Sequence, residues 1–177
     1  MVHPAVNPAY GRRMDIRPAT QSDVDALIAS FADAPAAQYH VRDRWVVQQR
    51  DEGVFLLAHR DGEIVGQTIL LRRSKYGELR ADADPAEINA LQAYVRGQGI
   101  GTAIIRAAEA IAAEEWKRSA IGLAVELDND RARKLYTRLG YEPWSGPQLL
   151  DHWTEQAADG TVVRTHSDPC EYLLKTF

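Results

Sequence analysis

Apolar residues recur at helical spacing in four parts of the chain, and each part predicts an amphipathic helix. The predicted helices cover about 21–32, the stretch after Pro35 that carries Tyr39, Trp45 and Val46, about 100–116, and about 129–140. Thr20 precedes Asp23 by three residues, which is the arrangement of a capping box at the start of the first helix. Gly140 follows the last apolar position of the fourth helix, where a left-handed residue ends many helices.

Short apolar runs between turn signals predict strands. These runs cover 15–17, 54–58, 64–71, 87–94, 121–127 and 172–174. Asp61-Gly62 lies between two of them and predicts a tight hairpin, because both central residues of such a turn need a positive φ. Asp159-Gly160, between 149–154 and 161–163, predicts a second hairpin. Residues 72–85 have no periodicity and are predicted to form a loop.

Length and composition restrict the class of protein. A chain of 177 residues that is 45% hydrophobic and 26% charged predicts one globular domain of mixed α and β type. We predict a flexible arm over 1–13 and a single domain over 14–177, in which 142–177 is a less regular strand and hairpin region. The 21 Lys and Arg against 25 Asp and Glu leave a net charge of -4, which argues against binding nucleic acid through bulk charge.

The cysteine, histidine and apolar content predicts a cytoplasmic protein without a metal. Cys170 is the single cysteine, so it cannot form an internal disulfide, and we expect a buried structural thiol rather than a nucleophile. The longest wholly apolar run, Val54–Ala58, is far too short to cross a membrane. Residues 1–13 lack the apolar core of a secretory signal. The five histidines have no metal-ligand spacing, so no metal is predicted.

The main candidate for chemistry is the segment Arg96-Gly97-Gln98-Gly99-Ile100-Gly101, between a predicted strand and a predicted helix. Its glycines allow the backbone to approach a ligand closely. The first amides of the helix have no intrahelical acceptors and lie at the positive end of its dipole, so this pattern favours a phosphate or pyrophosphate. A tight turn that only packs the helix on the sheet is the structural alternative. A P-loop would need Gly-Lys-Ser/Thr, and the dinucleotide fingerprint fails at Thr102 or Ile104.

Arg96-x-x-Gly99-x-Gly101 at a strand-to-helix junction resembles the acetyl-CoA signature of the GNAT superfamily of N-acetyltransferases. Segments 15–23, 62–66 and 125–141 also resemble that family in order and spacing, so the resemblance spans about 14–144. The family often has a proline where Ala93 stands. The resemblance implies a single GNAT-type domain with a mixed, mostly antiparallel central sheet flanked by about four helices. It also implies acetyl-CoA as cosubstrate, with no metal.

The same resemblance implies a cofactor site. The amides of Gln98 to Thr102 would hold the pyrophosphate of coenzyme A, and the backbone of Leu91 to Ala93 would pair with its pantetheine as an added strand does. A splay or bulge in that strand would free the backbone groups for this pairing. The residues placed at the cofactor are Leu91, Gln92, Ala93, Arg96, Gly97, Gln98, Gly99, Ile100, Gly101, Thr102, Asn129 and Arg131. Asn129 is also a candidate N-cap, and Arg131 is otherwise part of a solvated face.

The resemblance and the chemistry of acetyl transfer also indicate catalytic residues. Tyr136 is the candidate general acid, which would protonate the leaving thiolate; the alternative is a core tyrosine with a satisfied hydroxyl. Glu87 is the first candidate for the general base, because it lies on the predicted strand face shared with Asn89 and Leu91. Glu126, or ordered water with backbone carbonyls, could accept the proton instead.

These observations predict an acetyl-CoA-dependent N-acetyltransferase that moves the acetyl group directly to a primary amine in a ternary complex. The expected acceptor is a small-molecule or peptide amine, without a nucleic-acid or membrane partner, and a homodimer remains open. The segments 39–45, 72–85 and 141–177 could all border the acceptor pocket, and Trp45, Trp144 and Trp153 are candidates either for that pocket or for the core. Two alternatives are a non-catalytic acyl-CoA-binding or sensing module of the same fold and a nucleotide-binding domain of another fold.

Overall fold

The computed structural model describes residues 14–157 and 159–177, so the arm predicted over 1–13 lies outside the described residues. In chain order the elements are β1 (Asp15–Pro18), α1 (Gln21–Ser30), α2 (Pro35–Gln49), β2 (Gly53–Arg60), β3 (Glu63–Leu71), α3 (Gly77–Asp82), β4 (Ala86–Ala93), α4 (Ile100–Ala110), the π-helical turn η1 (Ile111–Glu115), β5 (Ala120–Glu126), α5 (Asp130–Arg138), β6 (Glu142–Pro143), β7 (Leu149–Gln156) and β8 (Val162–Thr176). The mixed α+β class is confirmed, with five α-helices in the described part of the chain. No helix among these is long and apolar enough to span a bilayer.

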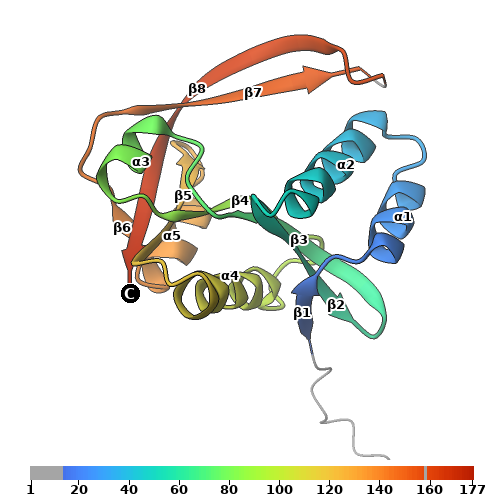
Figure 1. The fold of residues 1–177 in the computed structure, drawn as a ribbon, viewed down its shortest axis with the longest axis horizontal. Helices are drawn as coiled ribbons and strands as arrows, with labels where there is room; N and C mark the ends of the chain where they lie inside the picture. The colour runs from blue at the N-terminus through green and yellow to red at the C-terminus, as the bar shows by residue number, and fades with distance from the viewer. Residues whose placement is uncertain (1–13, 158) are drawn as a thin grey trace, which may run out of the picture.

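Eight strands form one sheet in the order β1-β2-β3-β4-β5-β8-β6, and β7 pairs with β8 beside this path. Every neighbouring pair is antiparallel except β4 and β5, which are parallel. Helices α1 and α2 lie on one side of the sheet and α4 lies on the other (Figure 1). The β7–β8 hairpin extends from the sheet toward α2 and lies on the same side of the sheet as that helix.

Both faces of the central strands are buried. Phe55 and Leu57 of β2 pack with Val24 and Leu27 of α1. Leu56, between them, faces the opposite layer, because successive side chains of a strand point to opposite faces. A sheet covered on both sides therefore produces the continuous apolar run in β2.

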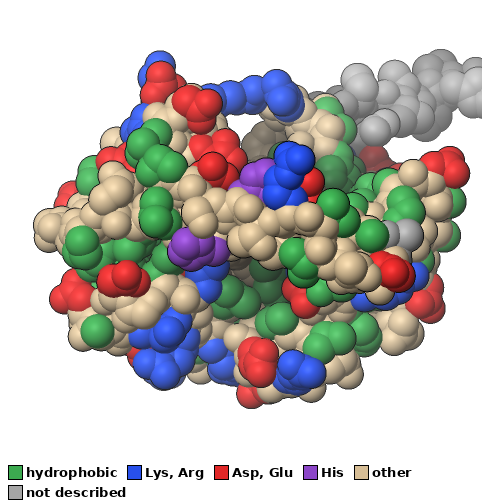
Figure 2. Space-filling model, turned by 90° about the horizontal axis from the view of Figure 1, so that it is seen from above, with side chains coloured by type: hydrophobic (Ala, Val, Ile, Leu, Met, Phe, Trp, Pro, Cys, Tyr) green, Lys and Arg blue, Asp and Glu red, His purple; other side chains and the backbone are tan. Residues whose placement is uncertain are grey.

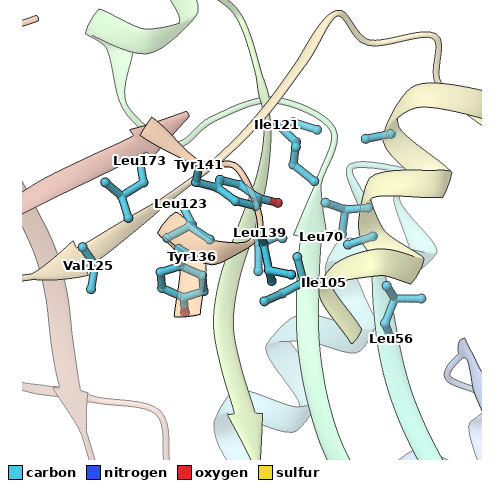
Figure 3. Packing of buried hydrophobic residues seen from close by; sticks show 14 residues of the cluster. Leu56, Leu70, Ile105, Ile121, Leu123, Val125, Tyr136, Leu139, Tyr141 and Leu173 are labelled. Carbon is cyan, nitrogen blue, oxygen red and sulfur yellow. The ribbon is translucent and has the colours of Figure 1, made fainter. Parts of the chain in front are cut away.

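The second core layer joins α4 and α5 to the sheet. Figure 3 shows Tyr136 of α5 and Leu139, the C-cap residue of that helix, close to Tyr141, with Ile105 of α4 packed in the same cluster. All four residues are at most 9% exposed. Packing in this layer therefore fixes α5 relative to α4, and both helices contribute to the site described below.

The hairpin predicted at Asp61-Gly62 is confirmed. β2 and β3 pair up to Arg60 and Glu63, which leaves a two-residue turn. Asp61 has a φ of 54° and Gly62 a φ of 84°. Positive values at both positions are what a type I′ turn requires, and its twist matches that of the strands.

The loop predicted over 72–85 is wrong in part, because it contains the six-residue helix α3. Leu79 in this helix is 0% exposed and packs with Tyr76, Leu149 and Tyr172. A helix of this length has room for one buried position, so no period can be read from it. Tertiary packing, rather than local pattern, decides its formation.

The C-terminal region is more regular than the sequence predicts. The hairpin at Asp159-Gly160 is present, but β7 and β8 are much longer than the runs 149–154 and 161–163. β8 pairs with β7 through its first half and with β5 through its second half. Its first half is mostly exposed and polar, so the apolar pattern that would have joined its two halves is missing.

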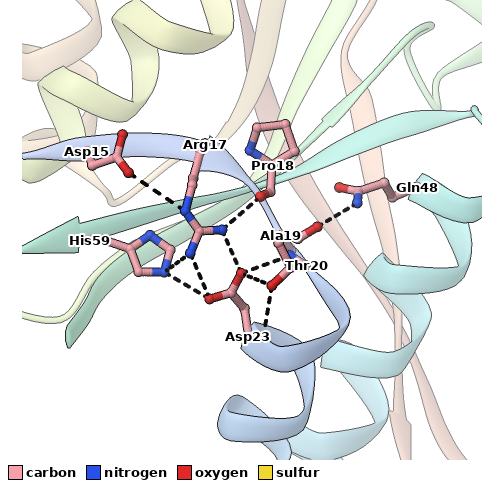
Figure 4. Close-up of polar contacts among 8 residues, drawn as sticks. All are labelled: Asp15, Arg17, Pro18, Ala19, Thr20, Asp23, Gln48 and His59. Carbon is pink, nitrogen blue, oxygen red and sulfur yellow. Dashed lines mark hydrogen bonds and ion pairs between the residues drawn. The ribbon is translucent and has the colours of Figure 1, made fainter. Parts of the chain in front are cut away.

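A polar network fixes the start of α1 to the sheet (Figure 4). Thr20 and Asp23 form the predicted capping box: the Thr20 amide donates to Oδ2 of Asp23 at 2.8 Å. Arg17 of β1 donates two hydrogen bonds to the same carboxylate, at 2.6 and 3.0 Å, and Nε2 of His59 lies 3.1 Å from Oδ1. The Arg17 guanidinium, followed by the Thr20 hydrogen bonds, holds the pKa of Asp23 well below its usual range.

Asp23→Ala is expected to lower the free energy of unfolding by about 2–3 kcal/mol at pH 7, because a cap and a charge-assisted pair are lost together. The folded-state pKa is depressed, so the contribution is complete above the ordinary Asp pKa of about 3.9 and is lost as the pH falls below it. Denaturant unfolding between pH 2 and pH 7 measures this.

The matched control is Asp25→Ala on the same helix, where an exposed carboxylate accepts a hydrogen bond from the Gln21 side-chain amide. Its stability should change by less than about 0.5 kcal/mol. Equal losses of unfolding free energy in the two variants would contradict the assigned role of Asp23. So would an Asp23→Ala variant whose stability still falls below about pH 4 as steeply as that of the wild type.

Candidate active site

The parallel strands β4 and β5 separate along their length. They pair only at Ala86–Ile121 and Glu87–Gly122, although β4 continues to Ala93 and β5 to Glu126. Beyond Glu87, the edge of β4 that faces β5 has no strand partner among the described residues. Its backbone donors and acceptors are therefore available to an extended ligand.

A β-bulge lies in the part of β4 that pairs with β3 but not with β5. The pairing with β3 steps from Gln67–Gln92 to Ile69–Asn89, so β4 has one residue more than its partner. Ala90 has a φ of 52°, which is uncommon for a residue with a side chain. The Thr68 hydroxyl holds the bulge by donating to the Asn89 carbonyl at 2.8 Å. Bulges bend a strand and redirect its side chains, and here the bulge lies at the opening.

The glycine loop follows β4 directly and leads into α4. Gly97 and Gly99 have φ values of 73° and 72°, and Gly99 is the N-cap of α4 without any side-chain cap. A Cβ added at either position would meet nothing within 4 Å, so the outer side of the loop is open. Arg60 of β2 supports the loop from behind by hydrogen bonding to the side chain and the carbonyl of Gln98.

Helix α5 closes the other side of the opening. Oδ1 of Asn129 accepts a hydrogen bond from the Ala132 amide at 3.1 Å, so the predicted N-cap is confirmed. Tyr136, one turn after Ala132, is 9% exposed and packs edge-to-face with Tyr141 at 6.1 Å between ring centroids. Burial raises the pKa of Tyr136, so its phenol stays protonated at neutral pH.

Two hollows meet at these residues. A groove of about 530 Å³ lies along the glycine loop, and a more enclosed cavity of about 320 Å³ lies between β4, β5 and the β7–β8 hairpin. The groove is lined by Leu91, Ala93, Val95, Arg96, Gly97, Gln98, Gly99, Ile100, Gly101, Thr102, Asn129, Arg131, Ala132, Leu135, Tyr136 and Arg138. Residues common to both are Leu91, Asn129, Ala132 and Tyr136. Tyr136 therefore lies where the groove and the cavity join.

All of the residues predicted at the cofactor line the groove except Gln92. The Gln92 side chain accepts a hydrogen bond from the Gln67 amide at 2.8 Å, and Gln67 in turn accepts one from Arg44 of α2. Gln92 is thus engaged on the α2 side of the sheet. Sequence reasoning missed four groove residues, Val95, Ala132, Leu135 and Arg138. The helical spacing of Leu135 and Arg138 from Arg131 is the signal that could have found those two.

Glu87 lies outside both hollows and is 0% exposed. Its carboxylate accepts hydrogen bonds from the Ser74 hydroxyl at 2.5 Å, the Asn89 amide at 3.2 Å and the Tyr172 hydroxyl at 3.4 Å. Burial raises the pKa of Glu87, while the hydrogen bonds from Ser74 and Asn89 oppose that rise. Asn89 lines the enclosed cavity, so Glu87 is one hydrogen bond away from it.

The enclosed cavity also contains residues of the 72–85 segment and of the tail, two of the segments expected as possible borders of the acceptor pocket, although the sequence did not single out these residues. They are Lys75, Asp151, Asp168 and Pro169, with Trp153 and Glu126 beside them. Trp153 is the tryptophan that lines the cavity, whereas Trp45 and Trp144 pack against core clusters. The residues of the hairpin approach β4 only in the folded chain, and strand alternation is the one local signal that places Asp151 and Trp153 on a common face.

The fold and the groove define a class of protein: a mixed α+β domain in which a glycine loop and the open edge of a strand border one groove. Residues 24–141 match the model of the acetyltransferase (GNAT) family, and the chain belongs to this family. It is therefore an acetyltransferase. The comparison with curated protein sequences gave no match.

Solved structures share the fold. The chain is similar to a ribosomal-protein-alanine N-acetyltransferase from Brucella melitensis, with a TM-score of 0.63, 22% identity, and coverage of 92% of this chain and 99% of that one. It is similar to a putative acetyltransferase from Salmonella typhimurium solved with its cofactor acetyl-CoA, with a TM-score of 0.61, 15% identity, and coverage of 92% and 93%. It is also similar to a spermidine N-acetyltransferase from Vibrio cholerae, with a TM-score of 0.63, 11% identity and the same coverage.

Proposed function

We propose that this protein transfers the acetyl group of acetyl-CoA directly to a primary amine while both substrates are bound. The observation that carries the proposal is that Tyr136 lines both the glycine-loop groove and the enclosed cavity. A thioester entering along the groove and an amine entering the cavity would meet at this phenol. Direct transfer needs that meeting point, because no intermediate carrier moves the acetyl group between two sites.

The groove fits coenzyme A in shape and charge. The left-handed Gly97 and Gly99 leave the amides at the start of α4 uncovered, as a pyrophosphate requires. Arg96 and Arg131 add positive charge at the rim of the groove. The unpaired edge of β4 up to Ala93 offers backbone groups to the amides of the pantetheine arm. When bound, acetyl-CoA supplies an activated acyl carbon and a thiolate leaving group.

Tyr136 is proposed as the general acid. Its phenol is protonated at neutral pH because burial raises its pKa. It can donate that proton as the thiolate departs. An ordinary phenol has a pKa of about 10 and a thiol a pKa of about 8.5, so the transfer is uphill unless the hydroxyl is held close to the leaving sulfur. Packing against Tyr141 holds the ring in place, so the core role and the chemical role are compatible.

The general base is proposed to be Glu126, directly or through ordered water. Its side chain is exposed, lines the enclosed cavity and has no hydrogen-bond or ion-pair partner in the described part of the chain. Glu87 is proposed as a positioning residue, which holds the Asn89 amide at the cavity wall by accepting its hydrogen bond. The burial of Glu87 supports this indirect role rather than contact with the amine.

Glu126→Gln is expected to lower kcat/KM for an alkyl amine by about 100-fold at pH 7, within the range for loss of a general base. The deficit should shrink toward pH 10, where a growing fraction of the amine is neutral without help. Steady-state rates from pH 7 to pH 10 measure it. The control is Glu142→Gln, an exposed carboxylate on β6 that lines neither hollow. A deficit that does not vary with pH would exclude Glu126 as the base.

The overall proposal is tested by release of free thiol from acetyl-CoA, measured over a panel of alkyl amines, amino acids and peptides, with calorimetric titration of coenzyme A alongside. Transfer requires both cofactor binding and amine-dependent thiol release. Binding without release by any amine would favour the non-catalytic acyl-CoA-binding alternative. Absence of binding would reject both.

A further inference from the structure

We propose that the acceptor of this acetyltransferase is an aliphatic amine with a second cationic group, and that Asp168 binds that second charge in the enclosed cavity. The inference rests on the proposed function and specifies its acceptor. The position of the site follows from the cavity itself, which joins the cofactor groove at Tyr136. The charged residues around it decide only which class of amine it accepts.

The register of the β7–β8 hairpin places two carboxylates side by side above the cavity. Asp151 of β7 pairs directly opposite Asp168 of β8. The neighbouring pair on the same face, Leu149 and Cys170, is buried in the core, so this face is the inner face of the hairpin. Like charges directly opposite each other destabilise a strand pair. A cation in the cavity would relieve this repulsion.

Only one of the two carboxylates has a cationic partner in the structure as described. Lys75 forms an ion pair with Asp151. Asp168 accepts a hydrogen bond from the indole nitrogen of Trp153 at 2.7 Å, which orients the carboxylate without neutralising it. Trp153 is itself held by stacking on His166, at 3.9 Å between ring centroids. Asp168 is therefore an oriented, uncompensated anion at the wall of the cavity.

The cavity as a whole is anionic. The ionisable Asp, Glu, Lys and Arg side chains that line it are Lys75, Glu126, Asp151 and Asp168. Three carboxylates and one ammonium give a formal charge of -2. On the face of the molecule seen in Figure 2, acidic and basic side chains are interspersed. An acceptor with its own carboxylate is repelled there, whereas a dication is attracted.

The reacting amine and the second cation have different requirements. The reacting nitrogen must lose its proton near Tyr136, and Glu126 is placed to receive it. Asp168 lies on β8 two residues before Cys170, which pairs with Glu126 of β5, and its carboxylate is oriented by the Trp153 indole; we assign it no part in that proton transfer. Its charge is useful to a group that stays protonated throughout the reaction, as a second alkyl ammonium does. These two demands together define a diamine-type acceptor.

The test compares acceptors of equal length that differ only at the far end: butylamine, 1,4-diaminobutane and 4-aminobutanoate, with the six-carbon set in parallel. At saturating acetyl-CoA, we expect kcat/KM for the diamine to exceed that of the monoamine by about tenfold or more, and the amino acid to be poorest. Raising the salt concentration should reduce the advantage of the diamine. Asp168→Asn should bring the ratio of diamine to monoamine close to one.

The control is Asp33→Asn, an exposed carboxylate between α1 and α2 that lines neither hollow, in which the ratio should stay at the wild-type value. A wild-type ratio near one, or a ratio unchanged by Asp168→Asn, overturns the inference while leaving acetyl transfer intact. If no amine reacts, the diamine site is tested by calorimetric titration of 1,4-diaminobutane into the protein loaded with coenzyme A. Binding that Asp168→Asn weakens supports the site although transfer has failed, and absence of binding rejects it.

Discussion

Gly99→Glu is expected to weaken binding of acetyl-CoA at least 100-fold, equivalent to about 2.7 kcal/mol. Gly99 is the N-cap of α4, and its φ of 72° leaves the first helical amides facing the groove. A carboxylate there adds negative charge at the pyrophosphate position, and its bulk covers the amides. Calorimetric titration with coenzyme A measures the loss.

Gly62→Glu is the matched control for this variant. Gly62 also has a positive φ, 84°, and a Cβ there also meets nothing within 4 Å, but it lies in the β2–β3 turn. Both variants bear the same added charge and the same left-handed strain, about 1–2 kcal/mol of lost stability. Only Gly99→Glu should lose the cofactor. Equal affinities for coenzyme A in the two variants would show that the glycine loop does not hold the pyrophosphate.

Tyr136→Phe is expected to lower kcat by about 100-fold or more, as loss of a general acid does, while the Kd for acetyl-CoA changes little. The phenol is placed where the groove meets the enclosed cavity, and its raised pKa keeps the proton available at pH 7. Phenylalanine retains the ring that packs in the core, so the fold should be preserved. Thiol release and calorimetry on the same preparation separate turnover from binding.

Tyr141→Phe provides the comparison. Tyr141 belongs to the same core cluster, is 1% exposed and touches the Tyr136 ring edge-to-face, but it lines neither hollow. Removing its hydroxyl tests whether any change to this aromatic pair slows the reaction. A kcat that falls equally in both variants, or one that survives Tyr136→Phe, would remove Tyr136 from the chemistry.

Local signals in the sequence were sufficient for the conformation of the glycine-loop side of the site, and the family resemblance selected the residues along the groove. The glycine loop, the first turn of α4 and the N-cap of α5 are short segments whose backbone conformation their own residues dictate. Gly99 is left-handed because it has no Cβ, and Asn129 caps because its side chain reaches the Ala132 amide. The predicted groove residues are therefore brought together almost as expected, with Gln92 the one that faces elsewhere.

The acceptor side depended on contacts between distant segments. Lys75 precedes α3, Asn89 follows Glu87 in β4, and Asp168 is on β8, so no local period links them. The bulge at Ala90 changed which strand positions face the opening, and such a bulge has no signature in an alanine. Burial of Glu87 beneath Ser74 and Tyr172 likewise arises from long-range packing.

The sequence by itself thus determined most of the helices and strands, the hairpin at Asp61-Gly62 and the glycine turn before α4, because each is set by neighbours within about one or two helical turns. The tertiary structure alone decided the separation of β4 from β5, the fold-back of the β7–β8 hairpin and the charge of the cavity beneath it. These features arise where strands far apart in the chain meet in a particular register. A register is a property of the pair of strands, and neither strand specifies it alone.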